Sequence, residues 1–190
     1  VIYHDDGSLD QRLALPKSPD IVLVDSELIA HAPVRLLVAG MGDAFSTYFE
    51  ARACHASASD NIHGGKSSFA AQGIARMCYD LLLSDGRKAK LAVENQLCTQ
   101  AVENIIEANT LLSGIGFESG GKGAAHSSGD GLNTIAQCKR MMHGEKVAFG
   151  TLVQLMMENA PYSELEEAYG FCKEIGLPIT LGQLGITEDV

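Results

Sequence analysis

The sequence contains no tryptophan, and aromatic residues make up only 6% of its 190 positions. It also lacks an apolar run of the about eighteen residues that a membrane-spanning helix needs. Basic residues are scarce, because 14 lysines and arginines face 24 acidic residues and leave a formal net charge of −10. Nucleic acids and anionic membranes bind basic surfaces, so neither is expected as a main partner.

Cysteine pairs of the kind that build a scaffold are missing too. The five cysteines are widely spaced between Cys54 and Cys172, and no Cys-x-x-Cys pair occurs. The odd number and the wide spacing argue against a disulfide framework or a zinc-finger set. We expect small, buried, apolar cysteines in a reducing, cytoplasmic compartment. No charged-then-apolar leader of the secretory type is found.

Apolar residues, in contrast, make up 46% of the chain, enough for a sizeable core. Signals for β-structure are confined to about the first thirty residues. We expect Val1–His4 to be extended, Asp5–Ser8 to turn, and Arg12–Leu15 to return as the second strand of a hairpin. The β-branched run at Ile21–Asp25 predicts a strand buried on both faces, followed by a helix N-cap at Asp25 and Ser26.

The rest of the chain shows the apolar spacing of helices almost throughout, which predicts a helical bundle. Residues 33–39 are expected to form a short apolar turn, and the expected helices cover residues 43–56, 66–83, 88–97, 99–112, 119–125, 143–159 and 162–174. No internal repeat is evident. The predicted fold is therefore mainly α. Residues 1–30 are expected to be the edge of an α/β sheet, residues 31–190 to form the helical domain, and the chain to be a piece of something longer.

Three polar residues lie beside small or apolar neighbours. Asp43 follows Gly40-Met41-Gly42, His126 follows the glycine-rich run 120–125, and His143 opens the stretch His-Gly-Glu-Lys. One carboxylate and two imidazoles can hold a catalytic zinc and leave one position open. Each residue also has a plain structural interpretation: Asp43 as a helix N-cap, His126 as a buried hydrogen-bonded residue, and His143 as a helix N-terminal residue. The histidines are too far apart for the i, i+4 geometry, so only folding can bring them together.

Other motifs give weaker evidence about function. The pair Gly114 and Gly116 forms a Gly-x-Gly, but within predicted helix rather than after a strand, which argues against a dinucleotide-binding turn. No Gly-x-Ser-x-Gly elbow occurs. The charged residues Glu50, Arg52 and Glu118 are expected on helix surfaces or behind the ligands rather than in catalysis.

Four stretches carry a family resemblance: GDAFSTYFEARAC at 42–54, EANTLLSGIGFESGG at 107–121, HGEKVAFGTL at 143–152 and GLPITL at 176–181. They resemble the glycerol dehydrogenases of the group III, iron-containing alcohol dehydrogenase superfamily, in order along essentially the whole chain. The resemblance implies a dehydroquinate-synthase-like fold. Its N-terminal α/β domain binds NAD, its C-terminal helical domain carries the metal, and the metal lies in the cleft between them.

By this resemblance, Asp43, His126 and His143 correspond to the ligands of one zinc ion per chain. His126 would also border the substrate as the catalytic residue, and Tyr3 would touch the cofactor NAD. The implied activity is NAD-dependent oxidation of glycerol to dihydroxyacetone, with zinc lowering the pKa of the substrate hydroxyl. A vicinal diol can offer two oxygens to one metal, which would favour glycerol over simple alcohols. The family also implies a homo-oligomer, commonly an octamer.

Departures from the family pattern leave alternatives open. Thr47 stands where iron-using relatives have a fourth ligand, Gly129 stands where a second histidine is usual, and Lys122 places a charge where the family tends to be apolar. The phosphate-binding loop and most of the NAD domain would lie before Val1. The alternative is therefore a truncated, non-catalytic module with a structural or interaction role. A metal-dependent hydrolase has little support, because no general base is evident near the ligands.

Overall fold

The computed structural model describes residues 2–4, 9–11, 17 and 19–187, and this part of the chain is mainly helical, as predicted. The α-helices are α1 (Ser26–Ala30), α2 (Val34–Ala56), α3 (Phe69–Glu94), α4 (Gln100–Glu107), α5 (Ser113–Gly120), α6 (Ala124–Leu132), α7 (His143–Met157) and α8 (Tyr162–Ile175). A π-helical turn, η1 (Ala108–Leu112), joins α4 to α5, and two 3₁₀ turns, η2 (Ala136–Arg140) and η3 (Gly182–Leu184), lie outside the bundle. None of the helices described is long and apolar enough to cross a bilayer.

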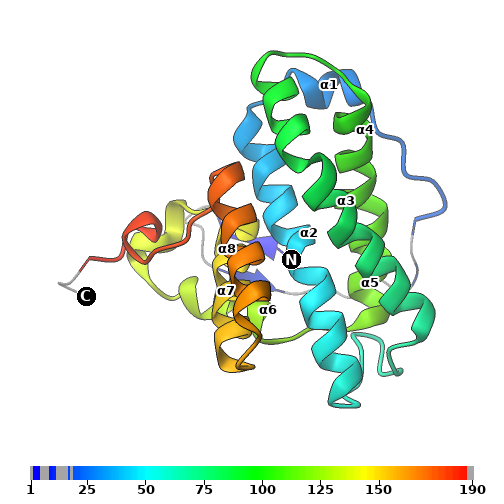
Figure 1. Cartoon of the computed structure of the whole chain (residues 1–190), viewed down its shortest axis with the longest axis vertical. Coiled ribbons are helices and arrows are strands. Elements are labelled where there is room, and N and C mark those ends of the chain that lie inside the picture. Colours follow the sequence, from blue (N-terminus) through cyan, green and yellow to red (C-terminus); the bar gives the residue numbers. More distant parts are fainter. Residues whose placement is uncertain (1, 5–8, 12–16, 18, 188–190) are drawn as a thin grey trace.

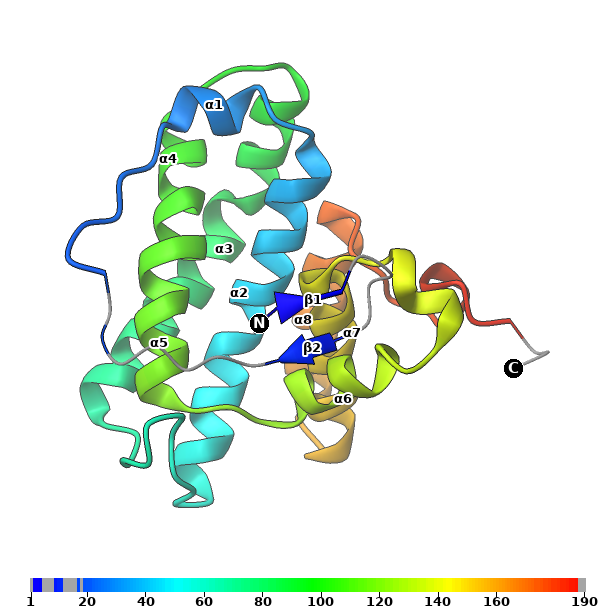
Figure 2. The ribbon, with the colours of Figure 1, turned by 180° about the vertical axis from the view of Figure 1, so that it is seen from behind.

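Helix α2 is the centre of the arrangement. It contacts α3 and α5 on one side and α6 and α7 on the other, so two groups of helices share it (Figure 1). Helices α3, α4 and α5 stand beside its length, while α6, α7 and α8 pack together against its other side (Figure 2). Residues on α2 can therefore meet residues from both groups.

Two short strands, β1 (Ile2–Tyr3) and β2 (Leu9–Gln11), pair antiparallel and are seen in front of α7 in Figure 2. Ile2 lies opposite Gln11 and Tyr3 opposite Leu9, which is the pairing of a hairpin. The predicted turn at Asp5–Ser8 and the predicted return strand at Arg12–Leu15 lie outside the described residues.

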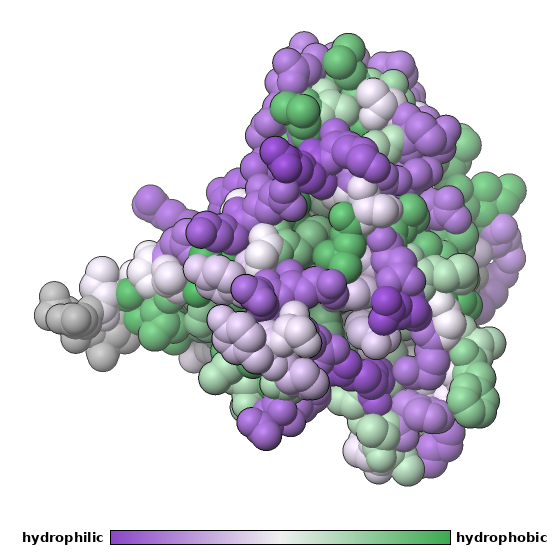
Figure 3. Space-filling view, in the orientation of Figure 1, coloured by the Kyte–Doolittle hydropathy of each residue, from purple (hydrophilic) through white to green (hydrophobic). Residues whose placement is uncertain are grey.

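The predicted strand at Ile21–Asp25 is wrong. Residues 21–24 form neither helix nor strand in the described part of the chain, and Ile21 and Leu23 are 83% and 94% exposed. Figure 2 shows this segment arching away from α4, and Figure 3 shows apolar side chains at the corresponding right-hand margin of the surface. The N-cap was predicted correctly, because the Asp25 carboxylate accepts a hydrogen bond from the backbone N–H of Leu28 at 3.2 Å.

Two helix boundaries also differ from the prediction. Helix α3 continues through Ser84-Asp85-Gly86, where a stop was expected, because Gly86 is buried at a close approach. A Cβ there would lie 3.2 Å from both Met41 and Phe171, so packing outweighs the roughly 1 kcal/mol that a helical glycine costs. Residues 119–125 are not one helix, because Gly121 takes a φ of 111° between α5 and α6.

The main core is built around aromatic rings. Phe45 on α2 lies 4.7 Å from Phe171 and 5.5 Å from Tyr79, measured between ring centroids. Phe49, one turn further along α2, lies 5.2 Å from Phe45 and completes the cluster. The cysteines follow the expectation: all five are free, and all but Cys98 are buried. The core thus fixes α2 against α3 and α8.

Candidate metal centre

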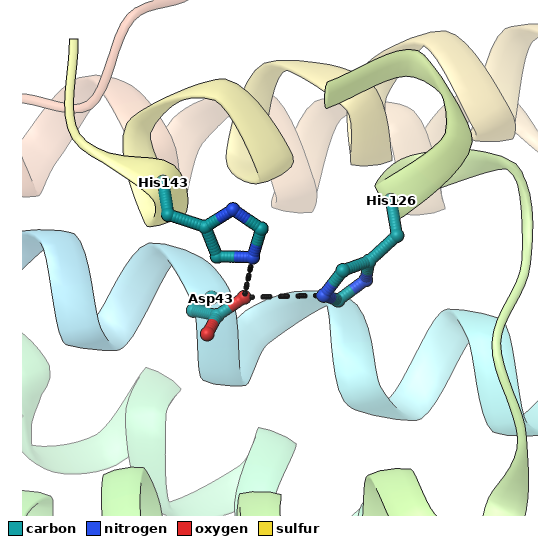
Figure 4. A group of neighbouring side chains, drawn as sticks. All are labelled: Asp43, His126 and His143. Carbon is teal, nitrogen blue, oxygen red and sulfur yellow. Dashed lines mark ion pairs between the residues drawn. The ribbon is translucent and has the colours of Figure 1, made fainter. Parts of the chain in front are cut away.

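The three predicted residues come from three helices and meet at one point (Figure 4). Asp43 lies in the middle of α2, His126 in the first turn of α6, and His143 at the first position of α7. Nε2 of His126 is 3.4 Å from Oδ1 of Asp43, and Nε2 of His143 is 3.5 Å from the same oxygen. One ligand atom from each residue lies within 4.8 Å of the others, which is close enough for a single ion to bond all three.

Asp43 is not a helix N-cap, contrary to its plain structural interpretation, because α2 begins at Val34 and runs straight through it. The glycine that precedes Asp43 explains the position of its side chain. A Cβ on Gly42 would lie 2.6 Å from the carbonyl oxygen of Gly144, and a Cβ on Gly144 would lie 1.8 Å from that of Ala39. These two glycines let α2 and α7 touch backbone to backbone, which brings Asp43 beside His143.

A third close contact places α6. A Cβ on Gly150 of α7 would lie 2.2 Å from the carbonyl oxygen of Ala125, so α6 also packs directly on α7. His126 follows Ala125 and is buried, with its ring centroid 5.3 Å from that of His143. The glycine-rich stretches therefore act in packing, and by that packing they bring the histidines together.

The electrostatic state of the cluster suits a cation. Burial, the largest influence, raises the pKa of Asp43, but the neighbouring His126 and His143 outweigh it and hold the pKa below its usual value. Burial lowers the pKa of His143, and the charge of His126 lowers it further. Asp43 is therefore ionised and His143 neutral near pH 7, which are the forms that bind metals.

His126 differs from its partner. Burial lowers its pKa, but polar contacts with Asp43 and Glu50 outweigh burial and raise the pKa to about 9. Without a metal, this ring carries a second proton at neutral pH. A metal ion that binds Nε2 must displace that proton.

One further observation tests whether a metal ion fits. Oδ1 of Asp43 is a buried polar atom without a hydrogen-bond partner of good geometry. Such atoms are rare in proteins and are commonly satisfied by a water or an ion. Because the two imidazole nitrogens lie about this same oxygen, the donor set fits a zinc ion with three protein ligands.

The remaining residues named from the sequence contribute no ligand. Thr47 is buried and its hydroxyl is 3.1 Å from that of Ser113, on α5. Gly129 faces α7, where a Cβ would lie 3.3 Å from Val147. Lys122 pairs with Asp130 at 3.1 Å rather than pointing freely at the site. The side chain of Tyr3 lies outside the described residues, so its contact with a cofactor stays a prediction.

Of the two positions expected for Glu50, on a helix surface or behind the ligands, the structure shows the second. The carboxylate is fully buried and lies 2.6 Å from Nδ1 of His126. Its position seven residues after Asp43 was the available signal, because two helical turns return a side chain to the same face. Phe117 covers His126 as well, with ring centroids 4.8 Å apart.

The geometry defines a class first: a helical domain with a carboxylate and two imidazoles arranged as a candidate metal site. Comparison with known proteins then specifies the family. No protein-family model matches the chain. The glycerol dehydrogenase of Citrobacter freundii is 50% identical over all 190 residues, which cover 52% of that protein. The chain is accordingly a homologue of the glycerol dehydrogenases, and it spans about half the length of the curated relatives it matches.

Solved structures agree on the fold. A probable glycerol dehydrogenase from Sinorhizobium meliloti superposes with a TM-score of 0.95 at 53% identity, covering 99% of this chain and 53% of the other. The glycerol dehydrogenase of Schizosaccharomyces pombe gives a TM-score of 0.93 at 42% identity, covering 99% of this chain and 48% of the other. The predicted family resemblance is therefore confirmed.

Proposed function

We propose that this chain is the metal-binding part of an NAD-dependent glycerol dehydrogenase. Asp43, His126 and His143 would hold one zinc ion, and His126 would border the substrate glycerol. Zinc, when bound, would lower the pKa of the substrate hydroxyl and stabilise the negative charge that develops on its oxygen. The observation that carries the proposal is the convergence of two imidazole nitrogens on the one buried oxygen of Asp43 that has no hydrogen-bond partner.

The protein's own residues prepare this site. Asp43 is held ionised and His143 neutral, the protonation states in which a carboxylate and an imidazole bind a metal. Phe117 packs against the ring of His126 and shields one side of it from water. The site is thus preorganised by three helices whose backbones touch, rather than by a mobile loop.

The domain assignment follows the same proposal. Residues 31–190 would be the helical metal-binding domain, and residues 1–30 the edge of the NAD-binding α/β domain, with Tyr3 touching NAD. The rest of that domain would belong to the half of the relatives that this chain does not match. As in the family, the enzyme would be a homo-oligomer.

A second candidate rests on the extent of the match. Because the chain spans about half of its relatives, it could be a folded module without catalysis. The two functions share the metal site and differ in turnover, so they need separate tests.

Elemental analysis of the purified chain tests the metal site. We expect about one zinc per chain, and loss of zinc in His126→Ala and His143→Ala. His31→Ala is the matched control, because His31 is exposed at the end of α1 and bonds the carbonyl of Glu27. Equal zinc content in all variants would contradict the proposed ligands.

Formation of NADH from glycerol at alkaline pH tests catalysis. We expect no turnover from the 190-residue chain alone, because the proposed cofactor domain is largely outside it. Turnover by this chain would show that the NAD site is complete within it and would refute that expectation.

A further inference from the structure

The buried carboxylate of Glu50 is the most unusual group near the site. Burying a charge is costly unless the charge is paired and hydrogen-bonded. Glu50 is fully buried in α2, between Phe49 and Ala51, which are also fully buried. Its position therefore needs a reason beyond packing.

Both oxygens of Glu50 serve the same residue of α6. Oε1 accepts hydrogen bonds from the backbone N–H groups of Gly123 and His126, at 2.8 and 2.9 Å. Oε2 lies 2.6 Å from Nδ1 of His126. One carboxylate thus holds the backbone and the imidazole of His126 together.

The hydrogen bonds that Oε1 of Glu50 accepts from the backbone replace a missing helix cap. Helix α6 begins after Gly123, which has no side chain to satisfy the free N–H groups of the first turn. Glu50 fills that role from a helix far away in sequence, and Gln154 of α7 completes it by accepting from the N–H of Ala125 at 2.9 Å. Glycine favours this close approach, because a Cβ on Gly123 would lie 3.1 Å from Oε1 of Gln154 and 3.2 Å from Cγ of Glu50.

The contact between Oε2 of Glu50 and the His126 ring determines which ring nitrogen is available to a metal. A carboxylate accepts hydrogen bonds and cannot donate them, so Nδ1 must carry the proton that it shares with Oε2. Nε2 then faces Asp43, as Figure 4 shows. Glu50 and Asp43 lie two turns apart on one face of α2, about 10 Å along its axis, and the ring of His126 is held between them.

We propose that Glu50 is a positioning residue for the metal site: its two oxygens clamp His126 so that Nδ1 is the donor and Nε2 is presented toward Asp43 and His143. The inference deepens the proposed function and rests on it for the identity of the ligand. Such outer partners of a histidine ligand fix its tautomer and orientation, and their loss typically lowers metal affinity about 10- to 100-fold.

Glu50→Gln is the informative variant, because it retains the size of the side chain. Its carbonyl oxygen can still accept from the two backbone N–H groups, so its amide nitrogen must face Nδ1. That nitrogen is a donor, which forces Nδ1 to accept and moves the ring proton to Nε2. Zinc affinity, measured by competition with a chromophoric chelator, should fall about 10- to 100-fold.

Gln154→Ala is the matched control. Gln154 is equally buried and caps the same end of α6, but it bonds the backbone of Ala125 rather than the ring. This variant should lower stability and leave zinc affinity within about threefold of wild type. Equal losses of zinc affinity in the two variants would mean that Glu50 acts only as a cap, and would overturn the inference.

Nitrogen-15 NMR of His126 supplies a readout that does not need zinc. Above pH 9, where the ring carries a single proton, that proton should be on Nδ1 in the metal-free wild-type chain and on Nε2 in Glu50→Gln. An unprotonated Nδ1 in wild type would overturn the inference even if the variant failed to fold, as would wild-type zinc affinity in Glu50→Gln. If wild type bound no zinc but showed the Nδ1 proton, the zinc proposal would fail and the clamp would be supported.

Discussion

Replacing Gly144 by alanine should separate the ligands without removing any of them. The added Cβ would lie 1.8 Å from the carbonyl oxygen of Ala39 and 2.9 Å from the backbone nitrogen of Asp43. Both neighbours are backbone atoms of α2, so no side chain can turn away. Helix α7 must therefore move away from α2 by more than 1 Å, because real Cβ contacts below 3.0 Å are essentially never observed.

The size of the effect follows from the bonds involved. Zinc sites tolerate departures of about 0.2 Å in ligand distance, so a shift of His143 by more than 1 Å should remove one bond. We expect zinc affinity to fall at least about 100-fold, equivalent to about 2.7 kcal/mol. Overpacking should also destabilise the metal-free chain by about 1–3 kcal/mol.

Chelator competition and urea unfolding measure the two effects separately. Gly73→Ala is the control, because Gly73 is exposed on α3 and an added Cβ meets nothing within 4 Å. That variant should gain up to about 1 kcal/mol from helix propensity and bind zinc as wild type does. Wild-type zinc affinity in Gly144→Ala would refute the argument that glycine contact between α2 and α7 builds the site.

Three other predictions concern the proton, the metal and the core. The pKa of His126 is raised to about 9, so below that pH a proton competes with zinc for the ring. Zinc affinity measured from pH 6 to 10 should therefore rise up to tenfold per pH unit and level off above about pH 9. A flat profile would contradict this prediction. Zinc at about 100 times its dissociation constant should add about 2.7 kcal/mol to the free energy of unfolding of the wild-type chain. EDTA should remove this increment, and Asp43→Ala should not show it. Phe45→Ala should lower the free energy of unfolding by about 3–5 kcal/mol, measured with denaturant, because the ring is fully buried. Met157→Ala, at the exposed end of α7, should change it by no more than about 0.5 kcal/mol. Equal losses would place Phe45 outside the core.

Much of the fold followed from local signals in the sequence. Helical spacing of apolar residues predicted the bundle. Asp25 begins α1 because its side chain caps the helix, and Gly176 ends α8 in the left-handed conformation that glycine favours. The boundaries that failed depend on distant contacts. Gly86 looked like a stop because its contacts with Met41 and Phe171 come from other helices.

The site shows the same division. The three proposed ligands were singled out as a possible zinc set, but local patterns favoured a helix cap for Asp43, and only the family resemblance assigned them as ligands. The feature that decides otherwise is the fit of Gly42 against Gly144, a hundred residues apart in the chain. A strand was expected at residues 21–25 because β-branched residues favour sheets, but a strand also needs neighbours, and the described part of the chain supplies none.

The segment at residues 21–24 has a practical consequence for work on the isolated chain. Consecutive aliphatic side chains of high β-propensity, of which Ile21, Val22 and Leu23 are exposed, are typical of segments through which chains aggregate. Preparations concentrated for NMR should therefore self-associate through residues 21–24. Leu23→Lys adds a charge outside the helices that carry the proposed zinc ligands and should keep such samples monodisperse.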